Sequence, residues 1–490
     1  MITVALPWTC EGLFERMMEP YAGSPLIEKI LVMAETEGRA IPSGMARPSV
    51  CVMATDAPSS GMTIRRIIGE TRSRYLLLVQ PCVKGRPVPD ALDRFVEVAE
   101  SSGAPMVYGD YAGHPVNDYQ VGSIRDSFDF GPLLFFNIPL LRRCICKYGD
   151  IPDVRHAGLY DLRLKASAAG ELFHLPECLS APVVGDIGAA LPIDGHFAYV
   201  DPRNRSYQVE MEQVATDHLK RLGAYLEPVF RNLPPCRETF PVTASVIIPV
   251  RNRARTIAEA VESALGQHTD FPFNIIVVDN HSSDGTTEIL DKLAKRHDRV
   301  KHIIPGRTDL GIGGCWNEAV RSPFCGRYAV QLDSDDLYGH TGVLERIVDA
   351  FHHGGETAMV IGSYTIVNER LEVIPPGLID HREWTDENGR NNALRINGLG
   401  APRAFRTDLI RRIGFPNVSY GEDYAVALRL SREYRIGRIY DSLYFCRRWT
   451  GNTDAALSIE TANRFDAYKD KLRTMEILAR MKMNRARKKK

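Results

Sequence analysis

The chain has 490 residues, and its 61 Lys and Arg residues balance 61 Asp and Glu residues. A hydrophobic content of 44% with 25% charged residues is ordinary for a globular protein. It excludes a disordered chain, a collagen-like repeat and a coiled-coil rod. At about 150 residues per domain, the length predicts about three domains. The zero net charge disfavours a protein that works mainly by binding nucleic acid.

The sequence shows no sign of membrane insertion or secretion. No window reaches the roughly 18–20 continuous apolar residues of a membrane span. The segment Met1–Trp8 lacks the basic start of a secretory signal. The ten cysteines include no CxxC pair, so a zinc ribbon or a thioredoxin-type site is disfavoured. We therefore expect a cytoplasmic protein whose thiols are reduced and mostly buried.

Strands and helices alternate from Thr243 onward. The predicted strands are Ala244–Val250, Asn274–Val278, Val300–Ile304 and Tyr328–Leu332, with helices over 256–265 and 286–296. This rhythm predicts an α/β fold with a mainly parallel sheet and right-handed crossovers. Ligands of such sheets bind beyond the carboxyl ends of the strands, where Asp279 and Asp333–Asp336 fall.

The N-terminal part repeats the same pattern. Residues 74, 75, 106, 107, 109 and 111 are identical to the residues 253 positions later, such as Arg74 and Arg327. Tyr160 recurs as Tyr424, at a spacing of 264. Several matches in the same order are typical of an internal duplication. We therefore predict two tandem α/β modules, over residues 1–185 and 241–455.

Two helical segments complete the predicted organisation. Residues 186–240 are expected to form a helical linker, with apolar residues at helical spacing within Val209–Leu226. Residues 456–490 are expected to form an amphipathic helix. Its predicted apolar face consists of Phe465, Tyr468, Leu472, Met475, Leu478 and Met481. It ends in a basic tail, Arg480–Lys490, which is a candidate for contact with an anionic membrane surface; a solubilising end is the alternative.

The sharpest chemical motif is Asp333-Ser334-Asp335-Asp336. Carboxylates this close repel one another unless a positive group lies between them. A divalent cation with oxygen ligands provides that group, and Mg²⁺ in particular takes one or two carboxylates plus substrate phosphates. The alternative is an acidic cluster at the start of the helix expected near Gly342.

The order of motifs from 243 to 455 resembles the family-2 glycosyltransferases, which have the GT-A (Rossmann-like) fold. The resemblance implies that Pro249-Val250-Arg251 lines the nucleotide pocket and that Asp279 accepts hydrogen bonds from the base. It implies that Asp333 and Asp335 form the DxD pair. Asp335, together with Asp333, would bind Mn²⁺ or Mg²⁺, and Asp333 with Ser334 would lie near the ribose and sugar.

Glu422-Asp423 resembles the pair of acids that supplies the general base in this family, with Asp423 as the expected base. Transfer at an anomeric carbon needs a base for the acceptor hydroxyl and a cation for the departing diphosphate. From the residues alone, two acids before a helix are also typical of a solvated helix N-terminus.

The chain departs from the family pattern in two segments. Trp449 stands where the family often has a metal-binding His, and Trp cannot coordinate a metal. We expect Trp449 either to contact substrate or to pack in the core, with Arg447 or Arg448 near phosphate. Trp384 is a candidate acceptor contact. The glycines at 311, 313 and 314 do not form GxGxxG, so they either approach phosphate or form a turn.

The first module lacks these reactive residues. Gln80-Pro81-Cys82-Val83 stands in place of the acidic motif, and Gly158-Leu159 in place of Glu422-Asp423. We therefore expect a silent module that braces the second, shapes the acceptor groove or forms a homodimer.

The resemblance implies an inverting, metal-dependent glycosyltransferase of polysaccharide biosynthesis. The expected donor is a UDP-sugar more than a GDP-sugar, and the expected acceptor is a glycan, a glycolipid or another hydroxyl compound. The alternatives are a silent sugar-binding scaffold or a sugar nucleotidyltransferase. The latter normally carries a Gly-rich signature after its first strand, and Pro249–Arg255 has no glycine.

Overall fold

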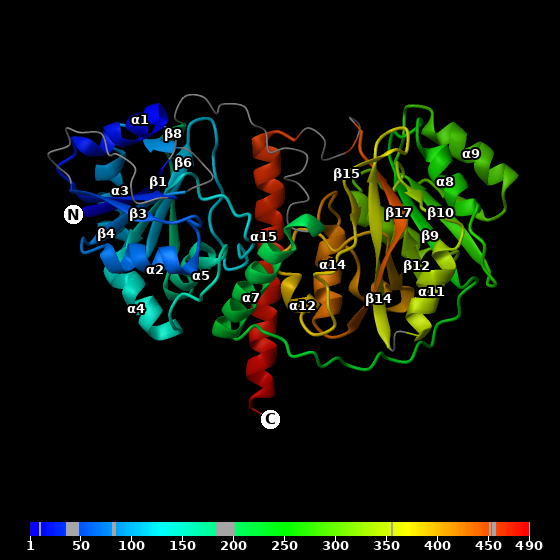
Figure 1. Ribbon diagram of the computed structural model, residues 1–490. Coiled ribbons are helices and arrows are strands. Elements are labelled where there is room, and N and C mark those ends of the chain that lie inside the picture. Colours follow the sequence, from blue (N-terminus) through cyan, green and yellow to red (C-terminus); the bar gives the residue numbers. More distant parts are fainter. Residues whose placement is uncertain are drawn as a thin grey trace. The chain divides into compact units, whose positions relative to one another are not determined.

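The computed structural model describes residues 1–8, 11–35, 49–80, 85–182, 201–353, 356–449, 452 and 457–489. The chain forms two compact units (Figure 1). Unit 1 comprises Met1–Ile193, Arg205–Tyr225 and Ser458–Lys490, and unit 2 comprises Asp194–Asn204 and Leu226–Leu457. Of the first-module residues that stand in place of the acidic motif, Pro81, Cys82 and Val83 lie outside the described residues.

Unit 1 is built on an eight-stranded sheet in the order β3-β2-β1-β4-β7-β6-β8-β5. Its strands are β1 (Ile2–Pro7), β2 (Ile27–Ala34), β3 (Ser49–Ala54), β4 (Tyr75–Val79), β5 (Gly85–Pro87), β6 (Met106–Tyr111), β7 (Leu133–Asn137) and β8 (Leu172–Pro182). Its helices are α1 (Glu11–Ala22), α2 (Gly61–Glu70), α3 (Ala91–Ser102), α4 (Ile138–Tyr148), α5 (Gly158–Ala169), α7 (Arg205–Leu222) and α15 (Ile459–Arg487). One core joins the sheet to α1 and α3, and a second core joins its other face to α2, α4 and α5.

Unit 2 is built on a sheet in the order β11-β10-β9-β12-β16-β14-β17-β13, with β15 paired to β14. Its strands are β9 (Ala244–Val250), β10 (Phe273–Asp279), β11 (Val300–Ile303), β12 (Tyr328–Gln331), β13 (Leu337–Tyr338), β14 (Thr357–Val367), β15 (Val373–Ile379), β16 (Arg403–Arg406) and β17 (Arg435–Arg447). Its α-helices are α8 (Ile257–Leu265), α9 (Thr286–Arg296), α10 (Ile312–Arg321), α11 (Val343–His353), α12 (Gly389–Asn392), α13 (Thr407–Ile413) and α14 (Glu422–Ser431); a 3₁₀ turn, η1, spans Pro202–Asn204. As the uncharged run of β9 predicts, the strands β9 and β10 are almost completely buried.

The two sheets have the same strand order, which confirms the tandem α/β modules. Element by element, β1 corresponds to β9, β4 to β12, β6 to β14 and β8 to β17. Each sheet is mixed: the central strands are parallel, and one strand, β7 or β16, runs antiparallel to both of its neighbours. The fold class inferred from the sequence is therefore correct for both modules.

A close helix contact is also shared by the two units. A Cβ added at Gly61 would lie 1.8 Å from the carbonyl oxygen of Pro152, and one added at Gly313 would lie 1.9 Å from that of Pro416. The Gly61 N–H donates to the carbonyl of Val154 at 2.8 Å, and the Gly313 N–H donates to that of Val418 at 3.0 Å. Because unit 1 keeps this contact without the acidic motifs, the contact serves packing.

The helix α7 is an integral part of unit 1, whereas the sequence suggested a linker. The Glu210 carboxylate accepts hydrogen bonds from the backbone N–H groups that precede α5. Arg221 pairs with the buried Asp161 at 2.7 Å. The predicted apolar position Val209 is 47% exposed. Of the predicted linker, residues 186–200 lie outside the described residues.

The helix α15 is present as predicted, but the prediction of its buried face was wrong. Met475 and Leu478 are 60% and 54% exposed. The buried side chains are mostly charged, and they are Lys469, Asp470, Arg473, Glu476, Ile477 and Arg480. These charges are paired, as in Asp470 with Arg473 and with Arg125 of unit 1. Pairing offsets the cost of burying a charge, so apolar periodicity does not identify this face.

The described cysteines are all free thiols, but only Cys144, Cys315 and Cys325 among them are buried. The expectation of mostly buried thiols is therefore wrong for the described chain. Among the described residues, no helix combines the length and the hydropathy that a membrane crossing requires.

Candidate active site of unit 2

The predicted site residues lie at the carboxyl ends of three adjacent strands. In the sheet, β9 lies between β10 and β12, and Asp279 at the end of β10 faces Val250 across the ladder. The Leu332 N–H, just after β12, donates to the carbonyl of Ile247 on β9. The segment after β9 therefore lies between Asp279 and the Asp333 turn.

Asp279 differs from its predicted role. Its carboxylate is fully buried, and it accepts from the Ser282 N–H at 3.0 Å and from the Thr287 hydroxyl at 2.5 Å. His302 lies 3.4 Å away. A carboxylate whose oxygens are engaged inside the protein fixes the 280–287 turn and offers little to a nucleotide base.

Three further predicted contacts are also buried within the protein. The Val250 side chain belongs to the hydrophobic core and is 3% exposed. Ser334 is 8% exposed, and its carbonyl accepts from the Thr256 hydroxyl. The Trp384 indole is 5% exposed and packs against Gly389, which removes it from the candidate acceptor contacts.

The Asp333–Asp336 turn is held by a residue of β17 and by the last residue of β12. The Asp333 N–H donates to the Tyr444 hydroxyl at 2.9 Å, and the Asp333 carboxylate accepts from the Gln331 amide at 2.9 and 3.0 Å. Burial and the negative charges of neighbouring carboxylates raise the pKa of Asp333 and of Asp336, although Arg403 opposes this effect at Asp333. The ionised forms of these carboxylates are therefore disfavoured in the protein alone, and a nearby cation would favour them.

Asp336 and Arg447 hold the turn against β17. The Asp336 carboxylate accepts from the backbone N–H of Arg447 at 2.7 Å. The Arg447 guanidinium is 6% exposed and pairs with Glu259 at 2.6 Å. Of the two arginines predicted to lie near phosphate, Arg447 is thus engaged within unit 2, and the prediction for Arg448 stands.

Asp335 is hydrogen-bonded to Trp449. Its Oδ2 accepts from the indole Nε1 of Trp449 at 3.1 Å and from the Asn452 amide at 3.3 Å, and the Arg253 Nε lies 3.6 Å away. Trp449 is therefore not part of the hydrophobic core described for unit 2, in contrast to one of its two predicted positions. Its indole N–H donates to Asp335, the carboxylate predicted to bind the metal.

The donor set suits a hard divalent cation with few protein ligands. Within the described ranges, no group of three or more His, Cys, Asp or Glu side chains is arranged to hold a metal ion. The nearby ligands are the carboxylate oxygens of Asp333 and Asp335. This set fits Mg²⁺ or Mn²⁺ that takes its remaining ligands from phosphate and water, and it does not fit a closed zinc site.

Glu422 and Asp423 begin α14 and differ in environment. Asp423 forms an ion pair with Arg403 of β16, and Arg403 also donates to the Gln331 side chain at 2.9 Å. Gln331 in turn donates to Asp333. The structure thus links the predicted base to the predicted sugar-binding carboxylate through two residues that the sequence reading missed.

Glu422 is 8% exposed, and its Oε2 has no hydrogen-bond partner in the described structure. Burial, followed by the negative charge of Asp423, raises the pKa of Glu422 to about 8. Because its ordinary value is 4.5, folded Glu422 holds a proton that the unfolded chain releases. Stability from this group is therefore lost as the pH rises between these values.

We expect Glu422→Gln to become progressively more stable than the parent as the pH is raised from about 5 to about 8. The glutamine cannot ionise, so it avoids the buried charge. Apparent melting temperatures at a series of pH values measure the difference. The exposed Glu345→Gln on α11 is the control, and its difference should stay flat. A flat difference for Glu422→Gln would show that this carboxyl is not buried as described.

The glycines at the start of α10 pack against the segment that precedes α14. A Cβ added at Gly313 would meet the Pro416 carbonyl and would lie 3.0 Å from the Glu422 Cβ. A Cβ added at Gly311 would lie 2.5 Å from the backbone of Val418. These glycines therefore place α14, and Trp316 beside them packs on Phe415.

Gly313→Ala is expected to displace the start of α14 and to lower any activity that needs Glu422 or Asp423 at least tenfold. Such overpacking also costs about 1–3 kcal/mol of stability. Catalytic rate and melting temperature are measured together. Gly61→Ala places the same clash in unit 1, and Gly306→Ala has no atom within 4 Å of the added Cβ. If all three variants lose activity equally, Gly313 has no specific role.

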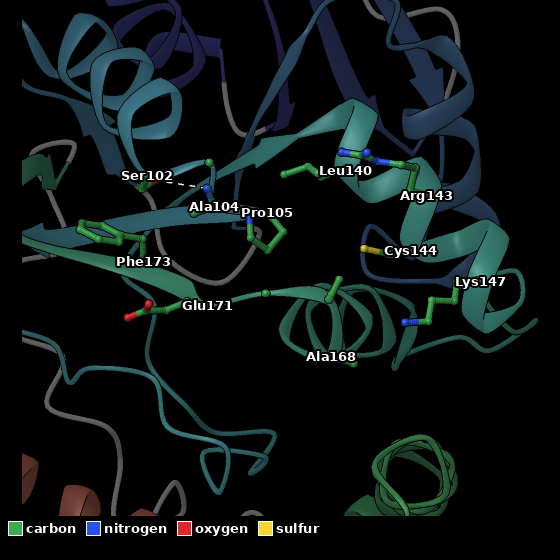
Figure 2. Close-up of a pocket in the computed structure, with 13 residues that line it drawn as sticks. Ser102, Ala104, Pro105, Leu140, Arg143, Cys144, Lys147, Ala168, Glu171 and Phe173 are labelled. Carbon is green, nitrogen blue, oxygen red and sulfur yellow. Dashed lines mark hydrogen bonds between the residues drawn. The ribbon is translucent and has the colours of Figure 1, made fainter.

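The corresponding site of unit 1 lacks acidic groups at the described positions. The Gln80 amide donates to the Gly131 carbonyl, and α5 begins with Gly158 where α14 begins with Glu422. A cavity of about 650 Å³ lies in this unit, between α4, the end of α5 and the amino ends of β6 and β8. Figure 2 shows Arg143, Cys144 and Lys147 of α4 along one side of it. This is the opposite end of the strands from Gln80.

Residues 245–413 match the family model described as Glycosyl transferase family 2. The chain is 24% identical over 211 residues to a poly(ribitol-phosphate) beta-glucosyltransferase of Bacillus spizizenii, covering 42% of this chain and 32% of the relative. It is 41% identical over 134 residues to a chondroitin synthase of Escherichia coli, covering 27% of this chain and 19% of that relative. The chain therefore spans a third or less of these relatives' own lengths.

A crystal structure of Staphylococcus aureus TarS in complex with UDP-GlcNAc is also similar, with 23% identity and a TM-score of 0.38. That match covers 49% of this chain and 72% of the other. The family match extends from β9 to the end of α13, so it includes Asp279 and the Asp333–Asp336 turn. The similarity to glycosyl transferase family 2 therefore rests on residues 245–413 of this chain.

Proposed function

We propose that the chain is an inverting, metal-dependent glycosyltransferase that moves a sugar from a nucleotide-activated donor to an acceptor hydroxyl. The observation that carries the proposal is the chain of contacts from Asp333 through Gln331 and Arg403 to Asp423. These contacts connect Asp333, which can bind the donor sugar, with Asp423, which can take the acceptor proton. They lie at the carboxyl ends of the parallel strands, where ligands of such sheets bind.

In this reaction the acceptor oxygen attacks the anomeric carbon, its proton leaves, and the nucleoside diphosphate departs from the opposite face. Asp423 at the start of α14 takes the proton. Arg403 orients the Asp423 carboxylate and favours its ionised form. Asp333, oriented by Gln331 and Tyr444, holds the donor sugar. A bound Mg²⁺ or Mn²⁺ would neutralise the departing diphosphate, with Asp335 as its principal protein ligand.

A panel of UDP- and GDP-sugars tests this proposal through release of the nucleoside diphosphate with Mn²⁺ or Mg²⁺. We favour UDP as the carrier, which agrees with the UDP-GlcNAc named for the TarS complex. The names of the two curated relatives favour an acceptor that is a growing glycan or polyol-phosphate polymer. Failure to release product from every donor, with intact folding, would favour a silent sugar-binding protein.

The basic end of α15 is proposed to touch an anionic membrane surface. The exposed charges begin at Lys482, because Arg480 is buried and paired with Glu476. The exposed apolar side chains of Met475 and Leu478 lie on the same helix. Arg480 is therefore excluded from the predicted basic tail, and the proposal rests on the basic residues from Lys482 onward.

Full-length chain is expected to float with anionic vesicles and not with neutral ones. Each basic residue near such a surface contributes about 1 kcal/mol, so removing residues 482–490 should abolish flotation. A matched variant with neutral residues at 485, 487, 488 and 489 keeps the helix length. Flotation that persists in both variants rejects the contact.

A further inference from the structure

Two arginines that follow β9 lie against one indole at the candidate site. The guanidinium carbon of Arg255 is 5.1 Å from the Trp449 ring centroid, and that of Arg253 is 5.8 Å away. Contacts of this kind hold a guanidinium in a defined place. Two positive charges gathered at one ring also repel each other, and an anion between them relieves that repulsion.

The backbone that carries these arginines is fixed from both sides. The Arg253 N–H donates to the Thr286 hydroxyl at 2.8 Å, and the Ala254 N–H donates to Asp284 at 3.0 Å. On the other side, the Thr256 hydroxyl donates to the Ser334 carbonyl at 2.9 Å. The backbone that carries the two guanidinium groups is therefore in place before any ligand arrives, which lowers the ordering cost of binding.

The charges nearby indicate which ligand these arginines suit. The Arg253 Nε lies 3.6 Å from Asp335, and Arg255, 71% exposed, has Glu369 at 3.8 Å. A phosphate that approached the Asp333–Asp336 turn would be repelled by its carboxylates. Guanidinium groups bind phosphate oxygens through paired hydrogen bonds, and two of them match the two phosphates of a diphosphate.

We propose that Arg253 and Arg255, with Trp449 as their shared support, form a clamp for the diphosphate of the donor. The clamp rests on the proposed function for the identity of the donor. In this clamp Trp449 does not bind a metal ion. Its indole ring instead contacts the guanidinium groups of Arg253 and Arg255. Part of the diphosphate affinity should therefore persist without a divalent cation.

The test is calorimetric titration of the full chain in EDTA with UDP, inorganic pyrophosphate and uridine. The parent is expected to bind UDP and pyrophosphate, and uridine far less. Arg253→Gln and Arg255→Gln should each weaken binding of both phosphate compounds about 10- to 100-fold, as expected for losing charge-assisted hydrogen bonds, and leave uridine unchanged. Arg296→Gln, an exposed arginine in the last turn of α9, is the matched control.

The outcomes separate the clamp from the enzyme assignment. A folded double variant of Arg253 and Arg255 that binds pyrophosphate like the parent overturns the clamp, and so does a parent chain that binds no pyrophosphate. A parent chain that binds pyrophosphate through these arginines but processes no nucleotide-sugar supports the clamp and rejects the proposed function.

Discussion

Asp423→Asn is expected to lower the rate of sugar transfer about 10²–10⁴-fold, the usual loss for a positioned base. UDP binding should change little. Asparagine has nearly the shape of aspartate, and its amide oxygen can still accept from Arg403, but it cannot take the acceptor proton. Steady-state kinetics and calorimetry separate the two effects, and the melting temperature shows whether the unpaired charge of Arg403 weakens the fold.

Glu422→Gln is the control for this assignment. Since burial raises the pKa of Glu422 to about 8, this side chain holds its proton near neutrality and makes a poor base. We expect its replacement to cost less than tenfold in rate. A parental rate in Asp423→Asn, or a larger loss in Glu422→Gln, would show that Asp423 is not the base.

Much of the fold could be predicted from the sequence because the strands that matter are buried on both faces. Uncharged runs such as Ala244–Val250 leave little choice but a central strand, and the spacing of such runs sets the parallel order. The duplication was visible because buried strands of both modules kept the same residues at the same spacing. Close packing also accounts for Gly61 and Gly313, because any larger side chain there would collide with a backbone carbonyl.

The partners of the site residues could not be predicted in this way. Arg403 comes from β16, Tyr444 from β17 and Gln331 from β12, and their meeting at Asp333 depends on the mixed part of the sheet. No local pattern encodes such a meeting. Asp423 lies in one network with Asp333, although they are far apart in the sequence, and no local pattern indicated that Asp279 would be buried and engaged.

The face of α15 shows where sequence reasoning fails for a physical reason. Apolar spacing predicts a buried stripe only where burial is apolar. Here Arg473 and Arg480 are fully buried, because Asp470 and Glu476 lie one turn earlier along the same helix and pair with them. A pattern of opposite charges three and four residues apart reads as a solvated surface, although in this helix it marks the packed side.

Asp335→Ala is expected to abolish the increase in UDP affinity that Mn²⁺ provides and to reduce transfer to near the limit of detection. The loss has two parts, because Asp335 is the proposed ion ligand and also accepts from Trp449. Titration with UDP in Mn²⁺ and in EDTA separates them: the metal-dependent part should vanish, while binding through Arg253 and Arg255 should remain. Asp336→Asn is the matched control, because the asparagine oxygen can still accept from the Arg447 backbone; this variant should keep the response to Mn²⁺. An Asp335→Ala protein that still binds UDP more tightly with Mn²⁺ would place the ion elsewhere.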